Sequence, residues 1–129
     1  METDRPVNFD DILLQHKMWL ETKDGDGILG DGKWTILKTV EEEGSLSAAC
    51  QKLGLTYRRT WGDLKKIEKQ LGFPLLNRIR GGKDGGMSEL SAQGKDLVAA
   101  FERFHKNVDQ VIYKAFEEFR ANLHFLINN

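Results

Sequence analysis

Two short helical patterns separated by Gly54 lie in the middle of this 129-residue chain and restrict its fold more than any other feature. Ser45 or Ser47 can cap the first helix, because a serine hydroxyl accepts hydrogen bonds from the free amides at a helix start. The apolar residues of that helix are Leu46, Ala48, Ala49, Cys50 and Leu53. Thr56 is placed to cap the second helix, which is expected to run to about Leu71. Two short helices joined by a glycine-containing turn predict a helix-turn-helix motif.

The second helix divides into two chemically different faces. At about 100° per residue, one mostly apolar stripe is expected to face the core, and it contains Thr60, Leu64, Ile67 and Leu71. The other side carries cations and one glycine, namely Arg58, Gly62, Lys65 and Lys69, with Arg59 and Lys66 beside them. The predicted helix is therefore anchored along one side and offers hydrogen-bond donors along the other.

Charge is concentrated around the same helix. Residues 51–83 contain nine basic and two acidic residues, a net charge of +7. The rest of the chain contains ten basic and eighteen acidic residues, a net charge of −8. Charge segregated in this way is typical of a face that meets a polyanion. A basic helix that is merely solvated would give the same count, so charge alone leaves both interpretations open.

A β-hairpin and a helix are expected before the motif. Asp24-Gly25 is a strong turn signal between the mixed segment 16–21 and the apolar pair Ile28-Leu29. A helix from about Lys33 follows, and Gly44 is expected to end it in a left-handed conformation. Its apolar residues share one broad face: Trp34, Ile36, Leu37 and Val40.

A second hairpin is expected directly after the motif. Leu75 to Arg80 predicts a strand, residues 81–86 a glycine-rich loop, and Met87 to Leu90 the returning strand. A hairpin in this position is the wing of a winged helix-turn-helix. A plain linker is the alternative, which the apolar segments on both sides of the loop disfavour.

The last helix is long. Ser91 can cap it, and it is expected to extend from about Ala92 to Phe119 or beyond. Apolar residues recur along it at spacings of four and three, as in a heptad repeat. The residues predicted to hold two copies together are Leu97, Phe101, Phe104, Val108, Val111 and Ala115. We expect a homodimer, and the alternative is a helix that packs entirely on its own domain.

The expected fold class is mainly α with small β-hairpins, a winged helix-turn-helix with a long C-terminal dimerisation helix. Residues 1–11 are expected to be a flexible N-terminus, residues 12–91 the winged helix-turn-helix domain with its N-terminal hairpin, and residues 92–129 the dimerisation helix. The apolar runs are far shorter than the roughly 20 residues of a membrane span, and no signal peptide is evident. The single cysteine, Cys50, fits a reducing compartment, so the cytoplasm is expected.

These elements predict a surface that binds double-stranded DNA. Arg58 and Arg59 lie in the first turn of the second helix, where arginine can donate two hydrogen bonds to guanine. The helix start at Thr56 and the wing cations are expected to hold phosphates. The complete predicted set is Thr56, Tyr57, Arg58, Arg59, Gly62, Lys65, Lys69, Arg78, Arg80 and Lys83.

Gly62, the two aromatic residues of the second helix and the wing each have a second interpretation. Gly62 either lets DNA approach or makes room for packing inside the protein. Trp61 is expected to complete the edge of the core, and its alternative is stacking or a hydrogen bond to a phosphate. Tyr57 fits the core edge and a DNA contact equally. A basic hairpin that is only solvated is the alternative for the wing.

The same residues resemble the DNA-binding domain of the molybdenum-dependent regulator family (ModE). The likeness covers about residues 14–110 and is specific in Tyr57-Arg58-Arg59 and in Arg80-Gly81-Gly82-Lys83. It also includes Gly44–Ala49, Leu71–Leu76, Leu90–Gly94 and the segment Lys17–Glu21. A looser likeness to LysR-type regulators runs through the same motif. The resemblance implies a winged-helix dimer that binds promoter DNA.

Full-length members of the ModE family add C-terminal domains that bind molybdate. This chain has no room for them after its long helix, so molybdate binding is not expected within it.

The sequence contains little that indicates a metal site or an enzyme. His16, His105 and His124 show no metal-ligand spacing with Cys50, and no nucleophile–base pattern is evident. No metal, cofactor or catalytic residue is therefore expected, and the chain is not expected to be an enzyme. The alternative function is a winged-helix module that docks a protein partner without specific DNA binding.

Overall fold

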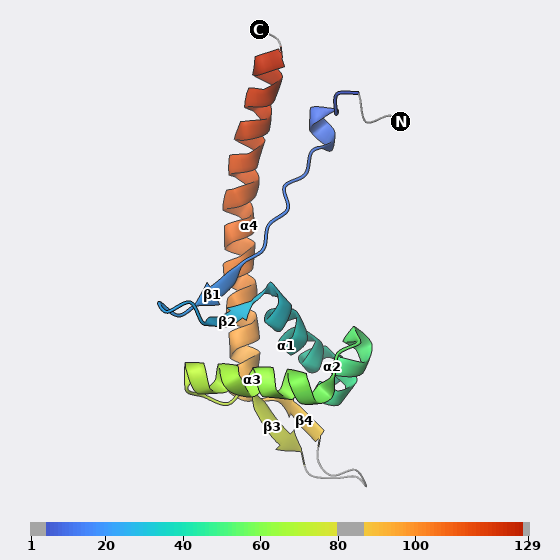
Figure 1. Cartoon of the computed structure of the whole chain (residues 1–129), viewed down its shortest axis with the longest axis vertical. Coiled ribbons are helices and arrows are strands. Elements are labelled where there is room, and N and C mark those ends of the chain that lie inside the picture. The colour runs from blue at the N-terminus through green and yellow to red at the C-terminus, as the bar shows by residue number, and fades with distance from the viewer. Residues whose placement is uncertain (1–4, 80–86, 128–129) are drawn as a thin grey trace. The chain divides into compact units, whose positions relative to one another are not determined.

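Four α-helices and two small hairpins are present in residues 5–79 and 87–127, the part of the chain that the computed structural model describes (Figure 1). In chain order the elements are η2 (a 3₁₀ turn, Phe9–Asp11), β1 (Trp19–Glu21), β2 (Gly27–Gly30), α1 (Asp31–Glu43), α2 (Leu46–Leu53), α3 (Tyr57–Leu71), β3 (Leu76–Ile79), β4 (Met87–Leu90) and α4 (Ala92–Ile127). The mainly helical fold and the expected order of helices and hairpins are confirmed.

The described residues form two compact units. One, which we call the helical unit, comprises residues 5–16 and 103–127, and the other, the winged-helix unit, comprises residues 17–79 and 87–102. This division differs from the boundaries expected at residues 11 and 91. The reason is that the segment up to His16 contacts the later turns of α4, whereas the first turns of α4 pack on the winged-helix core.

The β1–β2 hairpin depends on a close approach between its strands. They are antiparallel, and Trp19 lies opposite Gly30. A Cβ atom at Gly30 would lie 2.6 Å from Trp19 Cβ and 2.7 Å from the Met18 carbonyl oxygen. Only glycine fits this position without moving the backbone. The expected turn is present at Gly25, which has a φ of 94°.

The helices of the motif start and end where the sequence predicts. Ser45, rather than Ser47, caps α2, and its hydroxyl accepts a hydrogen bond of 3.1 Å from the Ala48 amide. Gly54 ends α2 with a φ of 69°, a conformation that is costly for other residues. Thr56 precedes α3, but its side chain makes no capping hydrogen bond.

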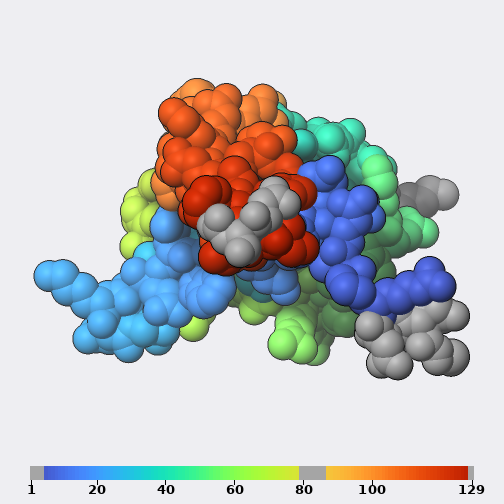
Figure 2. Space-filling model, turned by 90° about the horizontal axis from the view of Figure 1, so that it is seen from above, coloured from blue at the N-terminus to red at the C-terminus, as the bar shows by residue number. Residues whose placement is uncertain are grey.

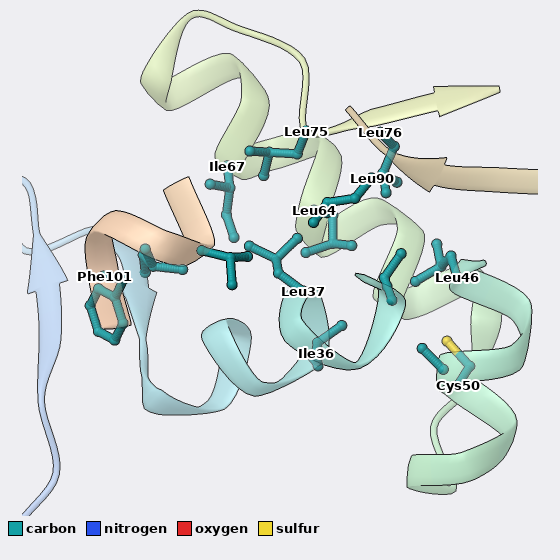
Figure 3. Packing of buried hydrophobic residues seen from close by; sticks show 14 residues of the cluster. Ile36, Leu37, Leu46, Cys50, Leu64, Ile67, Leu75, Leu76, Leu90 and Phe101 are labelled. Atoms are coloured by element: carbon teal, nitrogen blue, oxygen red, sulfur yellow. The ribbon is translucent and has the colours of Figure 1, made fainter. Parts of the chain in front are cut away.

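A cluster of apolar side chains holds the winged-helix unit together (Figure 3). Its largest fully buried members come from α1, α2, α3 and the residue before β3: Leu37, Val40, Leu46, Leu64 and Leu75. Each buried side chain of this size stabilises the fold by about 1.5–3 kcal/mol relative to an exposed one. The orientation of α3 is therefore set by the core, through Leu64 and Ile67.

The first turns of α4 belong to the same core. Phe101 is 4% exposed, and its ring centroid lies 5.7 Å from that of Trp34 on α1. The indole nitrogen of Trp34 donates a hydrogen bond of 3.3 Å to the Val98 carbonyl. These contacts fix the start of α4 against α1.

The wing is an antiparallel hairpin in which Leu76 lies opposite Leu90. Ser91 joins it to α4, because its hydroxyl donates to the Pro74 carbonyl at 2.6 Å and accepts from the Gly94 amide at 2.9 Å. A Cβ atom at Gly94 would lie 2.6 Å from the Leu75 carbonyl oxygen. The wing and the start of α4 are thus packed too closely for a side chain at this position.

Within the helical unit, the N-terminal segment lies along α4. The Arg120 guanidinium donates to the carbonyls of Asp10 and Ile12 at 3.4 and 3.3 Å. The ring of His124 lies 5.2 Å from that of Phe9. Figure 2 shows this segment, in dark blue, beside the red turns of α4. The residues of η2 are therefore held on the helix.

A carboxylate holds the other end of the same segment. Asp109 lies 2.8 Å from His105 Nδ1 on α4 and 3.2 Å from Nε2 of His16. The two histidine rings are stacked, with their centroids 6.2 Å apart. Asp109 thereby links the end of the N-terminal segment to α4.

Candidate nucleic-acid interface

The buried face of α3 is the one that the sequence predicts. Thr60, Leu64 and Ile67 are 4%, 0% and 3% exposed, and Leu71 packs partly buried against the same cluster. The residues predicted on the other side are exposed, apart from the half-buried Lys65: Arg58, Arg59, Gly62, Lys66 and Lys69. The predicted division of α3 into a core face and a solvent face is confirmed.

Arg58 and Arg59 lie in the first turn of α3 and are exposed. Among the described residues, neither guanidinium forms a hydrogen bond or an ion pair with another side chain. Their donors are therefore open to an external acceptor. Thr56, at the start of the helix, is also exposed and keeps its hydroxyl free of a capping bond.

Gly62 lies on the exposed face of α3 with open space above it. A Cβ atom there would meet no atom within 4 Å among the described residues. The interpretation that Gly62 makes room for packing within the protein is therefore wrong. A glycine inside a helix costs about 1 kcal/mol relative to alanine, and no internal contact offsets that cost.

Lys65 and Glu68 connect α3 to the wing. Lys65 Nζ lies 3.1 Å from Glu68 Oε1, and Glu68 Oε2 accepts hydrogen bonds from the amides of Leu75 and Leu76 at 2.7 and 3.0 Å. Partial burial of the carboxyl raises its pKa, but the amides of Leu76 and Leu75 and the ammonium of Lys65 lower it more. The pKa of Glu68 is therefore below its ordinary value.

The sequence did not predict this role for Glu68. The spacing of three residues indicates the ion pair with Lys65. It carries no information about the two amides beyond the end of the helix.

The two aromatic residues of α3 are exposed. Trp61 and Tyr57 each keep 42% of their surface accessible. The prediction that Trp61 completes the core is wrong, because the core is closed by Leu64 and Ile67 and the indole extends toward the wing. Lys65 Nζ lies over the Trp61 ring, 5.4 Å from its centroid.

The strands of the wing place Asn77 and Arg78 on β3, and both are exposed. Arg78 lies opposite Ser88 of β4. The hairpin confirms the expected wing and excludes a plain linker between β3 and β4. Arg80 and Lys83, two of the predicted DNA contacts, lie outside the described residues.

The predicted dimerisation seam divides into two parts. Phe101 is buried in the winged-helix core, so its side chain is not open to a second copy, whereas Leu97 packs against that core only partly buried. Phe104 and Val111 are 43% and 70% exposed, and Ala115 is also exposed. Val108 is half-buried.

None of the described helices has both the length and the apolar composition of a membrane-spanning segment.

Comparison with known sequences identifies the central motif. Residues 33–95 match the family profile described as bacterial regulatory helix-turn-helix protein, lysR family. This range contains α2, α3 and the wing, together with almost all of α1. The match therefore covers the elements that build the interface.

Individual relatives and structures agree with this assignment. The molybdenum transport protein ModE of Azotobacter vinelandii is 31% identical over 85 residues, which cover 66% of this chain and 31% of that protein. The DNA-binding transcriptional dual regulator ModE of Escherichia coli K12 is 26% identical over 106 residues, which cover 82% of this chain and 36% of that protein. This chain thus spans about a third of the length of the curated relatives it matches.

The crystal structure of the DNA-binding domain of CbnR in complex with DNA is similar in fold. Its TM-score is 0.50 with 20% identity over 65% of this chain and 91% of that one. The chain therefore contains a LysR-type helix-turn-helix domain with the architecture of a winged helix.

Proposed function

We propose that this chain binds double-stranded DNA and regulates transcription, with α3 in the major groove and the wing on the neighbouring backbone. The observation that carries the proposal is the exposed face of α3. Arg58, Arg59 and Lys69 are open to solvent opposite a stripe that is buried in the core. A recognition helix needs this arrangement, because it must be anchored while long donors reach base edges and phosphates. The name of the Escherichia coli relative, a DNA-binding transcriptional regulator, supports the same role.

The proposal includes a homodimer that assembles through α4. Phe104, Val111 and Ala115 lie on one face of this helix and are exposed in the single chain. Phe119, one turn further along the same face, is 56% exposed. Because Phe101 and Leu97 pack on the core, we place the seam from Phe104 onward. Helix-turn-helix dimers bind half-sites roughly 34–36 Å apart, and the same spacing is expected for this homodimer.

The proposal gives the chain a binding role in the cytoplasm and no catalytic step. It includes neither a metal nor molybdate among the ligands of the described residues. About two thirds of each relative lies outside the match, so the proposal is confined to the DNA-binding segment.

Selection from a pool of genomic fragments, repeated over a series of salt concentrations, tests the proposal. The purified protein is expected to enrich a palindromic site. The logarithm of the binding constant is expected to fall by about 0.9 per logarithmic unit of salt for each phosphate neutralised. A folded protein that binds no duplex DNA at low salt would contradict the proposal. That outcome would favour the alternative of a module that docks a protein partner.

A further inference from the structure

A hollow of about 280 Å³ lies between the recognition helix and the wing. Its walls are Tyr57, Trp61 and Lys65 of α3 on one side and Leu76, Arg78 and Ser88 of the wing on the other. These are the two elements that the proposed function places on DNA. The hollow therefore lies where the DNA backbone between two adjacent grooves would pass.

The α3 wall of the hollow is aromatic. Tyr57 and Trp61 are four residues apart and share one side of the helix. Each keeps 42% of its surface exposed, although rings of this size gain most when they are buried. An exposed pair of aromatic rings beside basic residues suits a flat or apolar part of a nucleotide, such as the deoxyribose.

The wing wall of the hollow carries hydrogen-bond donors. Arg78 and Ser88 face each other across the hairpin, and Arg78 is exposed without an ion pair to any described residue. Ser88 is only 8% exposed and lines the hollow from β4. Its hydroxyl can donate a hydrogen bond to a phosphate oxygen in the hollow.

The relative position of the two walls is fixed by Glu68. Its carboxylate accepts the amides of Leu75 and Leu76 and also pairs with Lys65, which lies over the Trp61 ring. The hollow is thus held open by hydrogen bonds between α3 and the start of the wing. A site that exists before its ligand arrives loses less free energy to ordering when it binds.

We propose that this hollow binds one sugar–phosphate unit of the DNA backbone. Tyr57 and Trp61 pack against the sugar, and Lys65, Arg78 and the hydroxyls of Tyr57 and Ser88 hold the phosphate. The inference rests on the proposed function and adds Trp61 and Ser88 to the DNA contacts. It explains why the two rings that line the hollow are exposed.

The test measures binding to a mixed-sequence duplex of about 30 base pairs over a salt series, because a backbone contact does not depend on sequence. Trp61→Ala is expected to weaken binding about tenfold and to leave the salt slope unchanged, since it removes packing and no charge. Arg78→Ala is expected to reduce the salt slope by about 0.9, the value for one phosphate. Tyr57→Phe keeps the ring and is expected to weaken binding about threefold through its hydroxyl alone.

Trp19→Ala is the matched control, because Trp19 is a 61% exposed tryptophan on β1 that does not line the hollow. This variant is expected to bind like the natural chain. Thermal unfolding of each variant shows whether it is folded. If Trp61→Ala does not fold, Tyr57→Phe and Arg78→Ala still test the inference.

The outcomes separate this inference from the proposed function. If the natural chain binds no DNA, the proposed function fails and this inference fails with it. If the natural chain binds DNA but the folded hollow variants match Trp19→Ala in affinity and salt slope, the inference about the hollow is wrong and the proposed function stands.

Discussion

Glu68, in the last turn of α3, accepts a hydrogen bond of 3.0 Å from the amide of Leu76, the first residue of the wing. The neighbouring amide of Leu75 donates to the same oxygen at 2.7 Å. One carboxylate thus sets the start of the wing against the recognition helix. Because both elements carry predicted DNA contacts, this joint determines their spacing.

Replacing this carboxylate is expected to destabilise the winged-helix unit in a pH-dependent manner. The pKa of Glu68 is lower in the folded chain than its ordinary value. Its contribution is therefore complete above the ordinary range of about pH 4–5 and is lost as the pH falls through the folded-state value. Glu68→Gln is expected to lower the free energy of unfolding by about 1–2 kcal/mol at neutral pH, and by progressively less below pH 4.

Urea unfolding at a series of pH values measures this effect. Glu89→Gln, on the exposed edge of β4, is the control and is expected to match the natural chain. A Glu68→Gln variant with the natural stability at neutral pH would show that the joint contributes nothing.

Substitutions of Gly62 are expected to affect the stability of the fold and the affinity for DNA in different ways. Gly62→Ala should raise the free energy of unfolding by about 0.8–1 kcal/mol, because the position is helical and the added methyl group meets no atom. Gly62→Gln should fold as well but weaken DNA binding, because a longer side chain then stands on the face that meets the groove. Gly32→Gln, at another open glycine on α1, controls for the added side chain. Equal DNA affinity of both glutamine variants would contradict the placement of Gly62 at the interface.

Replacing Gly94 with alanine is expected to lower stability, whereas the same substitution at Gly62 raises it. The Cβ position of Gly94 lies 2.6 Å from the Leu75 carbonyl oxygen and 3.0 Å from Leu90 Cγ, and a backbone carbonyl cannot move aside as a flexible side chain can. Gly94→Ala is therefore expected to lower the free energy of unfolding by about 1–3 kcal/mol. Urea unfolding beside Gly62→Ala makes the comparison, since the same substitution should change stability with opposite signs. A stabilised Gly94→Ala variant would be incompatible with the close packing of α4 on the wing.

The seam on α4 predicts a specific change in assembly. Val111 is 70% exposed on the seam face, and a carboxylate there would be desolvated in a dimer interface. Val111→Asp is expected to convert the dimer to a monomer in analytical ultracentrifugation. Gln110→Asp, at the exposed neighbouring residue, is expected to remain dimeric because it lies on another side of the helix. A natural chain that sediments as a monomer would contradict the homodimer itself.

The regular elements could be predicted because their signals are local. Glycines with left-handed backbone end α1, α2 and α3 at Gly44, Gly54 and Gly72, and the apolar spacing identified the core face of α3. These features depend on residues within a few positions of one another, so periodicity and turn chemistry were sufficient.

The errors arose where distant segments meet. Phe101 has the spacing of the α4 seam, but it packs against Trp34 of α1 and is buried in the core. Trp61 lies between the two faces of α3, and its surroundings depend on where the wing runs. Glu68 binds amides that follow the end of its helix. None of these contacts is visible in the spacing of residues along one helix.

In the proposed function, α3 reads DNA through the exposed arginines of its first turn. Fluorescence anisotropy with the fragment recovered from the genomic pool compares the natural chain, the double variant Arg58→Ala/Arg59→Ala and the control Arg103→Ala, which removes an exposed arginine outside α3. The double variant is expected to lose about thirtyfold or more in affinity, since each bidentate arginine–guanine contact contributes about 1–3 kcal/mol, whereas the control binds normally. A folded double variant that binds this fragment as tightly as the control does would contradict the account.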